Sequence, residues 1–399
     1  MQTADDAAYA GRHVQVDGVE LLNFGGCSYL GLEQRTELRD GAIAAIRRYG
    51  TQFSFSRAYV QSPLYQQLEA ALDAMTGGFA LVAPSTTLAH IAALPVLVQP
   101  GDAVLVDLLT HASVHVASGL LGSTPVTSVP HNDIDRLDHK IARLANKYRR
   151  IWLLLDGLYS MHGDFAPLEP LRALMQKHPA LHLYMDDAHA TSWLGKHGRG
   201  WVLDNLSERD RVVVALSLNK AFSAGGSALI LPTAQARATV RRCGGPMLFS
   251  GPVPPPMLGA AVASAELHLR PEFSDLQRDV MERIDLVLAL AEQLGVHFVT
   301  EERSPIFFVH CGHLGAMVHL TRALRTRGIY VSPCPFPSVP TGQEGIRFTV
   351  SRHNTEEDIR YLMEALSIEN RKLHEGQESG TIAIEHGLPP DPIETPVAS

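Results

Sequence analysis

The middle of the chain alternates short apolar runs with segments of helical periodicity, and this alternation constrains the fold most strongly. Two runs, IWLLLD ending at Asp156 and VVVALS ending at Ser217, are almost free of polar residues. Strands of this kind are buried on both faces, as in parallel sheets covered by helices. The order of the segments therefore predicts a layered α/β fold. The predicted strands are Phe79–Ala83, Ala103–Asp107, Arg150–Asp156, Leu181–Asp186, Val212–Ser217 and Ala228–Leu231, with helices over Pro63–Met75, Asp133–Tyr148 and Pro167–Lys177.

A proline-rich segment at residues 251–256, GPVPPP, marks a hinge in the chain. After it we expect a smaller α+β domain, with helices at Met257–Leu269, Asp275–Leu294 and Gly315–Arg327 and strands near Phe307–His310 and Ile346–Ser351. From about Lys372 the composition becomes polar and irregular, which is typical of a frayed tail. The predicted division is an N-terminal segment at 1–45, a large domain at 46–255, a small C-terminal domain at 256–370 and a tail at 371–399.

The composition fits a globular chain with a large core. Hydrophobic residues make up 45% and charged residues 19%. The net charge of −8, from 34 basic and 42 acidic residues, argues against nucleic acid as a partner. No apolar run approaches the roughly 18–20 residues of a membrane helix, and the first residues lack the apolar block of a signal peptide. The four cysteines are scattered, so we expect a cytoplasmic protein with no membrane span, disulfide framework or metal site.

Polar residues with possible chemical roles follow the ends of the predicted strands, where open α/β sheets bind their ligands. Asp186 ends one strand, His189 lies three residues later, and Lys220 follows the next strand. These three suit a pyridine cofactor bound as a Schiff base, because the carboxylate keeps the ring nitrogen protonated and the lysine forms the imine. The same residues also fit a capped strand-to-helix turn and a surface lysine. On spacing alone, both interpretations stay open.

Seven motifs, taken in order, resemble those of the α-oxoamine synthases. This family of fold-type I pyridoxal 5'-phosphate (PLP) enzymes joins an amino acid to an acyl thioester, usually with loss of carbon dioxide. The resemblance covers residues 20–368 and implies a mainly parallel seven-stranded sheet in the large domain, a smaller C-terminal α+β domain and a homodimer. The motifs are NFGGCSYLGL (23–32), THAS (110–113), DGLYSMHGDFAPL (156–168), DDAHATSWLGKHGRG (186–200), SLNKAFSAGGSA (217–228), LFSGPVPPP (248–256) and VPTGQEGIRFTVSRHNTEEDI (339–359).

The resemblance implies roles for four catalytic residues. Lys220 matches the Schiff-base lysine and Asp186 the partner of the pyridinium nitrogen. His189 matches the residue that hydrogen-bonds the cofactor's phenolate oxygen, and His111 matches the histidine that stacks on the ring. These assignments favour the cofactor interpretation over the capped turn.

Further residues match the family's cofactor and substrate contacts. Arg347 matches the arginine that binds the amino-acid carboxylate, a task that suits a bidentate guanidinium. A phosphate ester calls for hydroxyls and free backbone N–H groups at a helix start. The matching cofactor-binding positions are Ser85, Thr86 and Thr87 at a predicted helix start, Ser217 on the phosphate side, Ser160 near the cofactor's O3' side, and Ser250 beside the place of a threonine that reaches the partner subunit's phosphate.

The sequence departs from the family near the expected substrate. Phe53 and Phe55 stand where the family has glycines, so the substrate entrance is expected to be narrower or reshaped. Ordinary packing of that loop is the alternative interpretation. Cys27 and Ser28 replace an Asn-Asp pair, which removes an amide that helps to hold the carboxylate. Gly251 stands in place of the threonine expected near Ser250. We therefore expect a specialised substrate, with Cys27, Ser28 and Arg347 around it.

The expected function is a homodimeric PLP-dependent acyltransferase that condenses an amino acid with an acyl thioester, carried on coenzyme A or a carrier protein, to an α-aminoketone. An aminotransferase or lyase on the same scaffold is the first alternative. A non-catalytic homologue without cofactor is the second, and the presence of Lys220, Asp186, His189 and His111 together argues against it.

Overall fold

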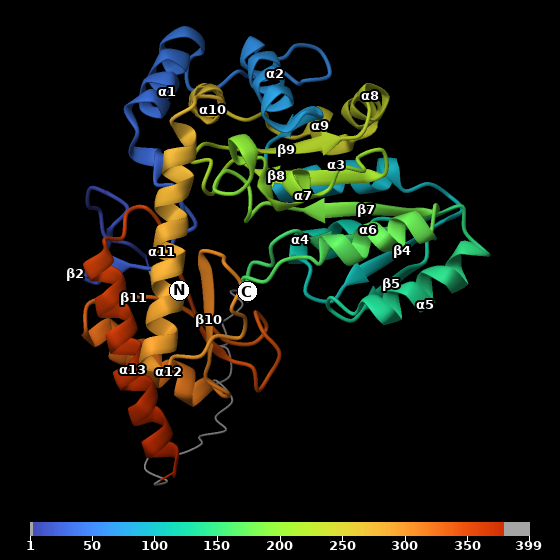
Figure 1. Ribbon diagram of the computed structural model, residues 1–399. Coiled ribbons are helices and arrows are strands. Elements are labelled where there is room, and N and C mark those ends of the chain that lie inside the picture. The colour runs from blue at the N-terminus through green and yellow to red at the C-terminus, as the bar shows by residue number, and fades with distance from the viewer. Residues whose placement is uncertain (1–2, 379–399) are drawn as a thin grey trace, which may run out of the picture.

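The computed structural model describes residues 3–378 and forms an α/β part and a C-terminal part (Figure 1). The α/β part is built on the predicted seven-stranded sheet. Only β9 runs antiparallel to its neighbours, because β9 pairs antiparallel with both β3 and β8. The strands lie in the order β3 (Phe79–Ala83), β9 (Ser227–Leu231), β8 (Val212–Ser217), β7 (Leu181–Asp186), β6 (Arg150–Asp156), β4 (Asp102–Asp107) and β5 (Val126–Val129).

Helices cover both faces of this sheet, and strand residues alternate between the two cores that result. In β7, for example, Leu183 and Met185 pack into one core and Tyr184 into the other. The first core is covered by α2 (Pro63–Thr76), α5 (Ile134–Ala145), α6 (Leu168–Lys177) and α7 (Gly200–Asn205). The second is covered by α3 (Thr86–Leu97), α4 (Ala112–Ser118), α8 (Ala234–Cys243) and α9 (Gly245–Phe249).

Helix α10 (Pro255–His268) links the two parts, because Leu258, Ala261 and Ala265 also pack into the first core of the large sheet, and the long helix α11 (Phe273–Leu294) follows it. The C-terminal part has a small antiparallel sheet of the order β10, β13, β12. The elements that complete it are β10 (Ile306–His310), α12 (Leu314–Thr326), β11 (Ile329–Tyr330), β12 (Ser332–Cys334), β13 (Gly345–Thr349) and α13 (Glu356–Glu378). The smaller α+β architecture agrees with the prediction. Helix α13 continues past residue 371, where the tail was expected to begin, and residues 379–399 of that tail lie outside the described chain.

The N-terminal segment pairs with the C-terminal part. Strand β1 (His13–Val16) pairs with β2 (Val19–Asn23), and β2 pairs in parallel with β11. Helix α1 (Thr36–Tyr49) crosses the predicted boundary at residue 45, and it packs against α10 where Gly41 meets Gly259. The segment after β2 thereby contacts both parts of the molecule: the carbonyl oxygen of Phe24 accepts the N–H of Thr349, and the hydroxyl of Tyr29 lies 2.8 Å from His189.

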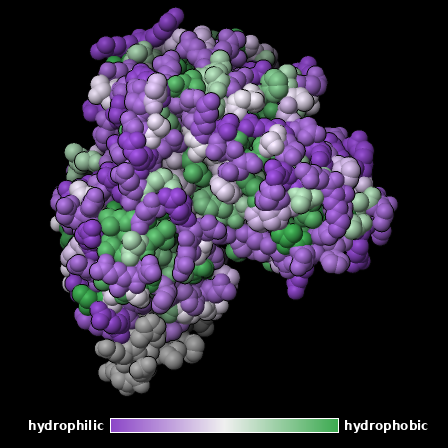
Figure 2. All heavy atoms as spheres, in the orientation of Figure 1, coloured by the Kyte–Doolittle hydropathy of each residue, from purple (hydrophilic) through white to green (hydrophobic). Residues whose placement is uncertain are grey.

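The face of the molecule in Figure 2 is mostly hydrophilic, with apolar side chains gathered in separate patches. No helix within residues 3–378 is long and apolar enough to cross a membrane.

Candidate active site

The carboxyl ends of β4, β6, β7 and β8 meet at one edge of the large sheet. Asp156 and Asp186 are direct neighbours in the register of β6 and β7. Lys220 follows β8, and His111 precedes α4. Burial raises the pKa of both carboxyls and lowers that of His111. The side chain of Lys220 lies close enough to lower the pKa of all three. The structure therefore brings the predicted residues of the Schiff-base site together.

Asp186 is buried and is held as a carboxylate. Its Oδ1 accepts a hydrogen bond from the backbone N–H of Ala188 at 3.1 Å, and its Oδ2 lies 3.0 Å from Nε2 of His90. Burial alone would raise the pKa of Asp186, but the bond to His90 and the neighbouring positive charges lower it below the ordinary value. A buried anion at this position is what a protonated pyridine nitrogen requires.

Asp156 has the opposite character, although it lies beside Asp186. Its carboxyl accepts the backbone N–H of His111 at 3.1 Å. Burial, together with the negative charge of Asp186, raises the pKa of Asp156 well above the ordinary value. The two carboxyls therefore share one negative charge, which resides on Asp186.

His111 forms the N-cap of α4. Its Nδ1 accepts the backbone N–H of Ser113 at 3.3 Å and lies 2.7 Å from the Ser113 hydroxyl, so the orientation of the ring is set by its own helix. The residue is exposed. Partial burial of the ring and the nearby Lys220 lower its pKa, although Asp186 opposes this. An oriented neutral ring of this kind can stack on a flat cofactor.

His189 is buried and fixed from both sides. Its Nδ1 lies 2.8 Å from the hydroxyl of Tyr29, and its backbone carbonyl accepts a hydrogen bond from Nε1 of Trp193 at 2.6 Å. Burial lowers the pKa of His189 well below the ordinary value and raises that of Tyr29 well above it, so both are neutral. The Tyr29 hydroxyl then donates to Nδ1, and the proton of His189 resides on Nε2. His189 is thus prepared as a hydrogen-bond donor.

The predicted phosphate side lies at the start of α3, directly after β3. The Ser85 hydroxyl caps the helix by accepting the N–H of Leu88 at 3.2 Å. The N–H groups of Thr86 and Thr87 are in the first turn, where the helix offers them no partner, so they are suited to an anion. Ser217 is buried at the end of β8, and its hydroxyl accepts the N–H of Asn219 at 3.3 Å. Ser250 follows α9, and its role stays a prediction because its expected partner belongs to another subunit.

The predicted substrate side is assembled around Arg347 of β13. This side chain is buried, and its Nε donates to the carbonyl oxygen of Ser160 at 2.7 Å. One terminal nitrogen lies 4.0 Å from Sγ of Cys27. Arg347 and Cys27, both predicted on the substrate side, therefore lie together, and Ser160, predicted near the cofactor's O3' side, lies beside them. The terminal nitrogens of the guanidinium are the atoms that can bind a carboxylate.

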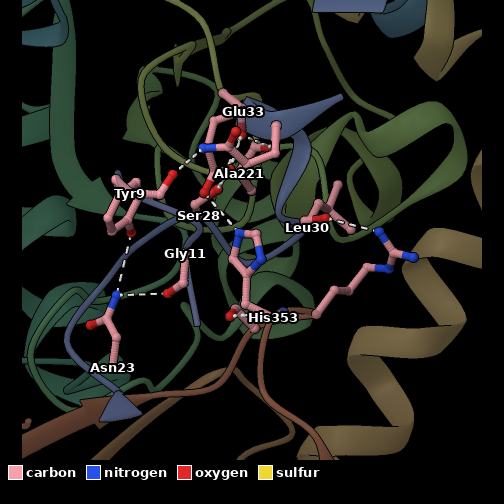
Figure 3. A network of polar contacts seen from close by, with 12 residues as sticks. Tyr9, Gly11, Asn23, Ser28, Leu30, Glu33, Ala221 and His353 are labelled. Atoms are coloured by element: carbon pink, nitrogen blue, oxygen red, sulfur yellow. Dashed lines mark hydrogen bonds and ion pairs between the residues drawn. The ribbon is translucent and has the colours of Figure 1, made fainter. Parts of the chain in front are cut away.

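Ser28 does not face Arg347 but enters a polar network around Glu33 (Figure 3). Its hydroxyl donates to Oε2 of Glu33 and lies 3.1 Å from the hydroxyl of Ser223, three residues after Lys220. Ser223 also donates to Oε2 at 3.3 Å, and Nε2 of His353 lies 2.8 Å from Oε1. The ring of His353 packs against Gly31, where a Cβ atom would approach it to 2.9 Å. Glu33 thus joins the Lys220 turn to the segment after β13.

Three residues of the site were not found from the sequence: His90, Tyr29 and Glu33. Tyr29 lies in the motif NFGGCSYLGL but was used only to recognise the motif. His90 lies in APSTTLAH, one turn after the phosphate-side residues. A polar residue on an otherwise apolar helix was the available signal for His90, and it was hidden among 19 histidines.

No group of three or more His, Cys, Asp or Glu residues within the described chain is arranged to hold a metal ion. The residues at the sheet edge instead fit PLP: a lysine, a buried carboxylate, a neutral histidine that donates from Nε2, and free N–H groups at the start of α3.

Comparisons with known proteins agree with this fit. The sequence pattern of the family "Aminotransferase class I and II" matches residues 19–366. The 8-amino-7-oxononanoate synthase of Maricaulis maris is 32% identical over 369 residues, which cover 92% of this chain and 91% of the relative. That of Pseudomonas syringae pv. tomato is 33% identical over 359 residues, covering 89% and 88%.

Solved structures share the fold. Serine palmitoyltransferase from S. paucimobilis, with a bound PLP–myriocin aldimine, superposes with a TM-score of 0.87 at 21% identity, covering 94% of this chain and 93% of the other. The 8-amino-7-oxononanoate synthase of Francisella tularensis has a TM-score of 0.76 at 20% identity, covering 89% and 99%. The chain therefore belongs to the aminotransferase class I and II family and, within it, to the α-oxoamine synthases, which are PLP-dependent acyltransferases.

Proposed function

We propose that this protein condenses an amino acid with an acyl thioester, with loss of carbon dioxide, to give an α-aminoketone. The observation that carries the proposal is the buried Asp186 carboxylate, held ionised at the end of β7 beside Lys220. A buried anion is costly unless cations and hydrogen-bond donors surround it, and a protonated pyridine nitrogen would supply a cation directly beside the carboxylate.

Each end of PLP has residues on this chain that would hold it. Lys220 would bind it covalently and Asp186 would pair with the ring nitrogen, while Nε2 of His189 would donate to the phenolate oxygen and His111 would cover the ring. Ser217 and the start of α3, with Ser85, Thr86 and Thr87, would hold the phosphate, and Ser160 and the partner subunit would complete the site. Bound there, PLP supplies an electron sink for negative charge at Cα of the amino acid. When the amino acid displaces Lys220, the freed amine can take or return a proton at that carbon.

Arg347 would bind the carboxylate of the incoming amino acid through its terminal nitrogens. Cys27 stands beside this guanidinium and contributes a thiol, a weak hydrogen-bonding group. Phe53 contacts Tyr49 and Phe55, with ring centroids 6.2 and 5.2 Å apart, and Phe55 is exposed. The thiol beside Arg347 and the two phenylalanines in place of glycines support a specialised substrate rather than glycine or alanine.

A homodimer is supported by exposed apolar residues close to the sheet edge that carries the site. Leu108 and Leu109 follow β4, Val116 lies on α4 and Leu120 follows it, and Phe249, at the end of α9, is 83% exposed. Side chains of this size are seldom left together in water, so a second copy is the expected cover. The four cysteines, all unpaired, fit the reducing cytoplasm, where we place the protein.

The test has two stages. Borohydride reduction of the PLP-loaded protein followed by peptide mapping should label Lys220, and Lys220→Ala should stay folded without turnover. Each of the twenty amino acids, labelled with ¹³C in the carboxyl group, is then supplied with acyl-coenzyme A or acyl carrier protein. Labelled carbon dioxide and an α-aminoketone, detected by mass spectrometry, are the expected products.

Other results would replace the proposal. A keto acid formed without acyl donor would indicate an aminotransferase, and cleavage of the amino acid alone would indicate a lyase. A protein that binds no PLP would be a non-catalytic homologue.

A further inference from the structure

A buried chain of hydrogen bonds leads away from Asp186 into the core. Oδ2 of Asp186 lies 3.0 Å from Nε2 of His90, and Nδ1 of His90 lies 2.8 Å from the hydroxyl of Tyr184. Tyr184 and Asp186 are two residues apart on β7 and so share one face of the strand. His90 reaches them from α3, and the side chains of His90 and Tyr184 are inaccessible to solvent. His90 therefore acts only through its two neighbours.

The protons in this chain can be assigned from its chemistry. Burial and the charge of Asp186 raise the pKa of Tyr184 well above the ordinary value, so the tyrosine keeps its proton. The hydroxyl can then donate to Nδ1 of a neutral His90, which in that form carries its proton on Nε2, facing the carboxylate. A bare Nε2 would direct a nitrogen lone pair at a buried anion, which is unfavourable. Tyr184 thus fixes the donor side of His90.

The bond from His90 to Asp186 matters because a second buried carboxyl, Asp156, lies beside Asp186. Asp156 and Asp186 are adjacent buried carboxyls, and such a pair does not readily carry two negative charges. The backbone donates one hydrogen bond to each, from His111 to Asp156 and from Ala188 to Asp186. His90 adds a side-chain donor to Asp186 alone. The bond from His90 is therefore the main difference in hydrogen bonding between the two.

We propose that His90 is a positioning residue that selects Asp186 over Asp156 as the ionised carboxyl, with Tyr184 holding His90 in the required tautomer. The inference rests on the proposed function, because the ionised Asp186 is needed for the ring nitrogen of PLP. The same helix, α3, supplies the N–H groups on the phosphate side, and His90 follows Ser85 by about 7.5 Å of helix rise. One helix thus sets both ends of the cofactor site.

The experiment measures PLP dissociation constants of the apoprotein by equilibrium dialysis. His90→Phe should weaken PLP binding about 10- to 100-fold, the effect of losing a hydrogen bond to a charged group. Tyr184→Phe, which removes one hydroxyl, should weaken it about threefold. In the Asp186→Asn background, His90→Phe should have no further effect. Asp156→Asn should restore part of the affinity lost in His90→Phe, because the competing carboxyl is gone.

The matched control is His268, another fully buried histidine, which stacks on Phe222 and bonds the backbone oxygen of Ser264 at 2.7 Å. His268→Phe should leave the dissociation constant unchanged. A second probe is 1-deaza-PLP, in which a C–H group replaces the ring nitrogen. Its binding should be the same in wild type and His90→Phe.

The outcomes are distinguishable. Equal losses of affinity for PLP and 1-deaza-PLP, or no coupling of His90→Phe to Asp186→Asn, would show that His90 only packs the core and would overturn the inference. If His90→Phe does not fold, the coupling of Tyr184→Phe to Asp186→Asn decides in the same way. A wild-type protein that binds no PLP at Lys220 would overturn the proposed function itself.

Discussion

Two sides of the proposed site are constructed differently: the ring-nitrogen side, with Asp156 and Asp186, and the substrate side, with Arg347, Cys27 and the network around Glu33. On the ring-nitrogen side, Asp156 and Asp186 are adjacent in one sheet, and their positions follow from the register of β6 and β7. On the substrate side, Glu33 bonds Ser223 across 190 residues of sequence and His353 across 320. The register of neighbouring strands in one sheet places the first set. The second set depends on bonds between segments far apart in the sequence, both through side chains and through the backbone, as from Thr349 to Phe24 at 2.7 Å.

The difference teaches where the site can change. A substitution on the ring-nitrogen side meets a packed sheet with helices on both faces, and it acts on charge more than on position. A substitution around Glu33 or Arg347 acts on how three segments meet. We therefore expect changes on the substrate side to affect amino-acid binding and leave PLP binding nearly unaltered.

The largest expected effect is that of Arg347→Ala. Loss of a charge-assisted contact in a partly dry site should weaken amino-acid binding by about 2–5 kcal/mol, or roughly thirty- to several-thousand-fold. PLP affinity should stay unchanged. The amino-acid dissociation constant can be measured from the change in the visible spectrum of the bound cofactor. Arg303→Ala is the control, since Arg303 pairs with Asp285 at 2.7 Å on the surface, outside the proposed contacts. An unaltered dissociation constant in Arg347→Ala would remove the proposed carboxylate contact.

Glu33→Gln tests whether the Glu33 network holds its segments together. The amide loses the charge that His353, Ser28 and Ser223 share, so the free energy of unfolding should fall by about 2–3 kcal/mol. Urea unfolding measures this value. Glu37→Gln is the matched control, because Glu37 is paired with Arg35 near the surface and should change stability by less than about 1 kcal/mol. Equal losses of stability in the two variants would show that the Glu33 network does not hold its segments together more strongly than a surface ion pair does.

Asp187→Asn tests how the buried carboxyl next to Asp186 in the sequence affects stability. The Asp187 carboxyl accepts the N–H of Val202 at 3.0 Å, and no group among residues 3–378 bonds its Oδ1. Burial raises its pKa from 3.8 to about 7. The folded state therefore favours the protonated carboxyl. Its contribution to the free energy of unfolding is fully present below about pH 4, and it is lost as the pH rises through 7.

At pH 8 the Asp187→Asn variant should be more stable than the wild type by about 1–3 kcal/mol, and at pH 4 the two should be nearly equal. Urea unfolding at pH 4, 6 and 8 measures this difference. A difference that does not depend on pH would contradict the assigned titration.

The smallest expected effect is that of Ser223→Gly. Ser223 has φ of +58°, a conformation that costs an L-residue about 1 kcal/mol and that glycine adopts freely. The glycine variant loses the hydroxyl bond to Glu33 but is relieved of this strain, so stability should change by less than about 0.5 kcal/mol. Ser223→Ala loses the bond and keeps the strain, and should cost about 1–1.5 kcal/mol in the same urea assay. Equal costs would mean that the strain is absent.

The strand ends on the ring-nitrogen side were predicted from the sequence because their physical basis is local. Apolar runs identify strands that are buried on both faces; Asp186 ends one such strand, and Lys220 comes three residues after another. The roles of the two residues toward a cofactor came from the resemblance to a family. Strand β5 was missed because three of its four residues are exposed. The pairing of β2 with β11 was also missed, since the two partners lie about 300 residues apart.

The unpredicted site residues share one property: their roles depend on partners brought together only by the tertiary fold. In the sequence, Glu33 looks like a surface acid after the motif, and only the structure shows His353 and Ser223 beside it. His90 is one of many histidines in the sequence, and only the packing of α3 against β7 brings it to Asp186 and Tyr184. The resemblance to a family supplied the residues expected to touch the cofactor, and the side chains behind them required the structure.

The separate construction of the two sides also bears on how the chain is made. A ribosome releases the N-terminal residues first, and domains generally fold as their residues emerge. All seven strands of the large sheet, together with Lys220, precede residue 232, whereas Arg347 and His353 come far later. Cys27 and Glu33 precede this sheet in the chain, but Arg347 beside Cys27 and His353 beside Glu33 both follow it. In the nascent chain, the residues proposed to hold the cofactor are therefore present before Arg347, the residue proposed to bind the amino-acid carboxylate.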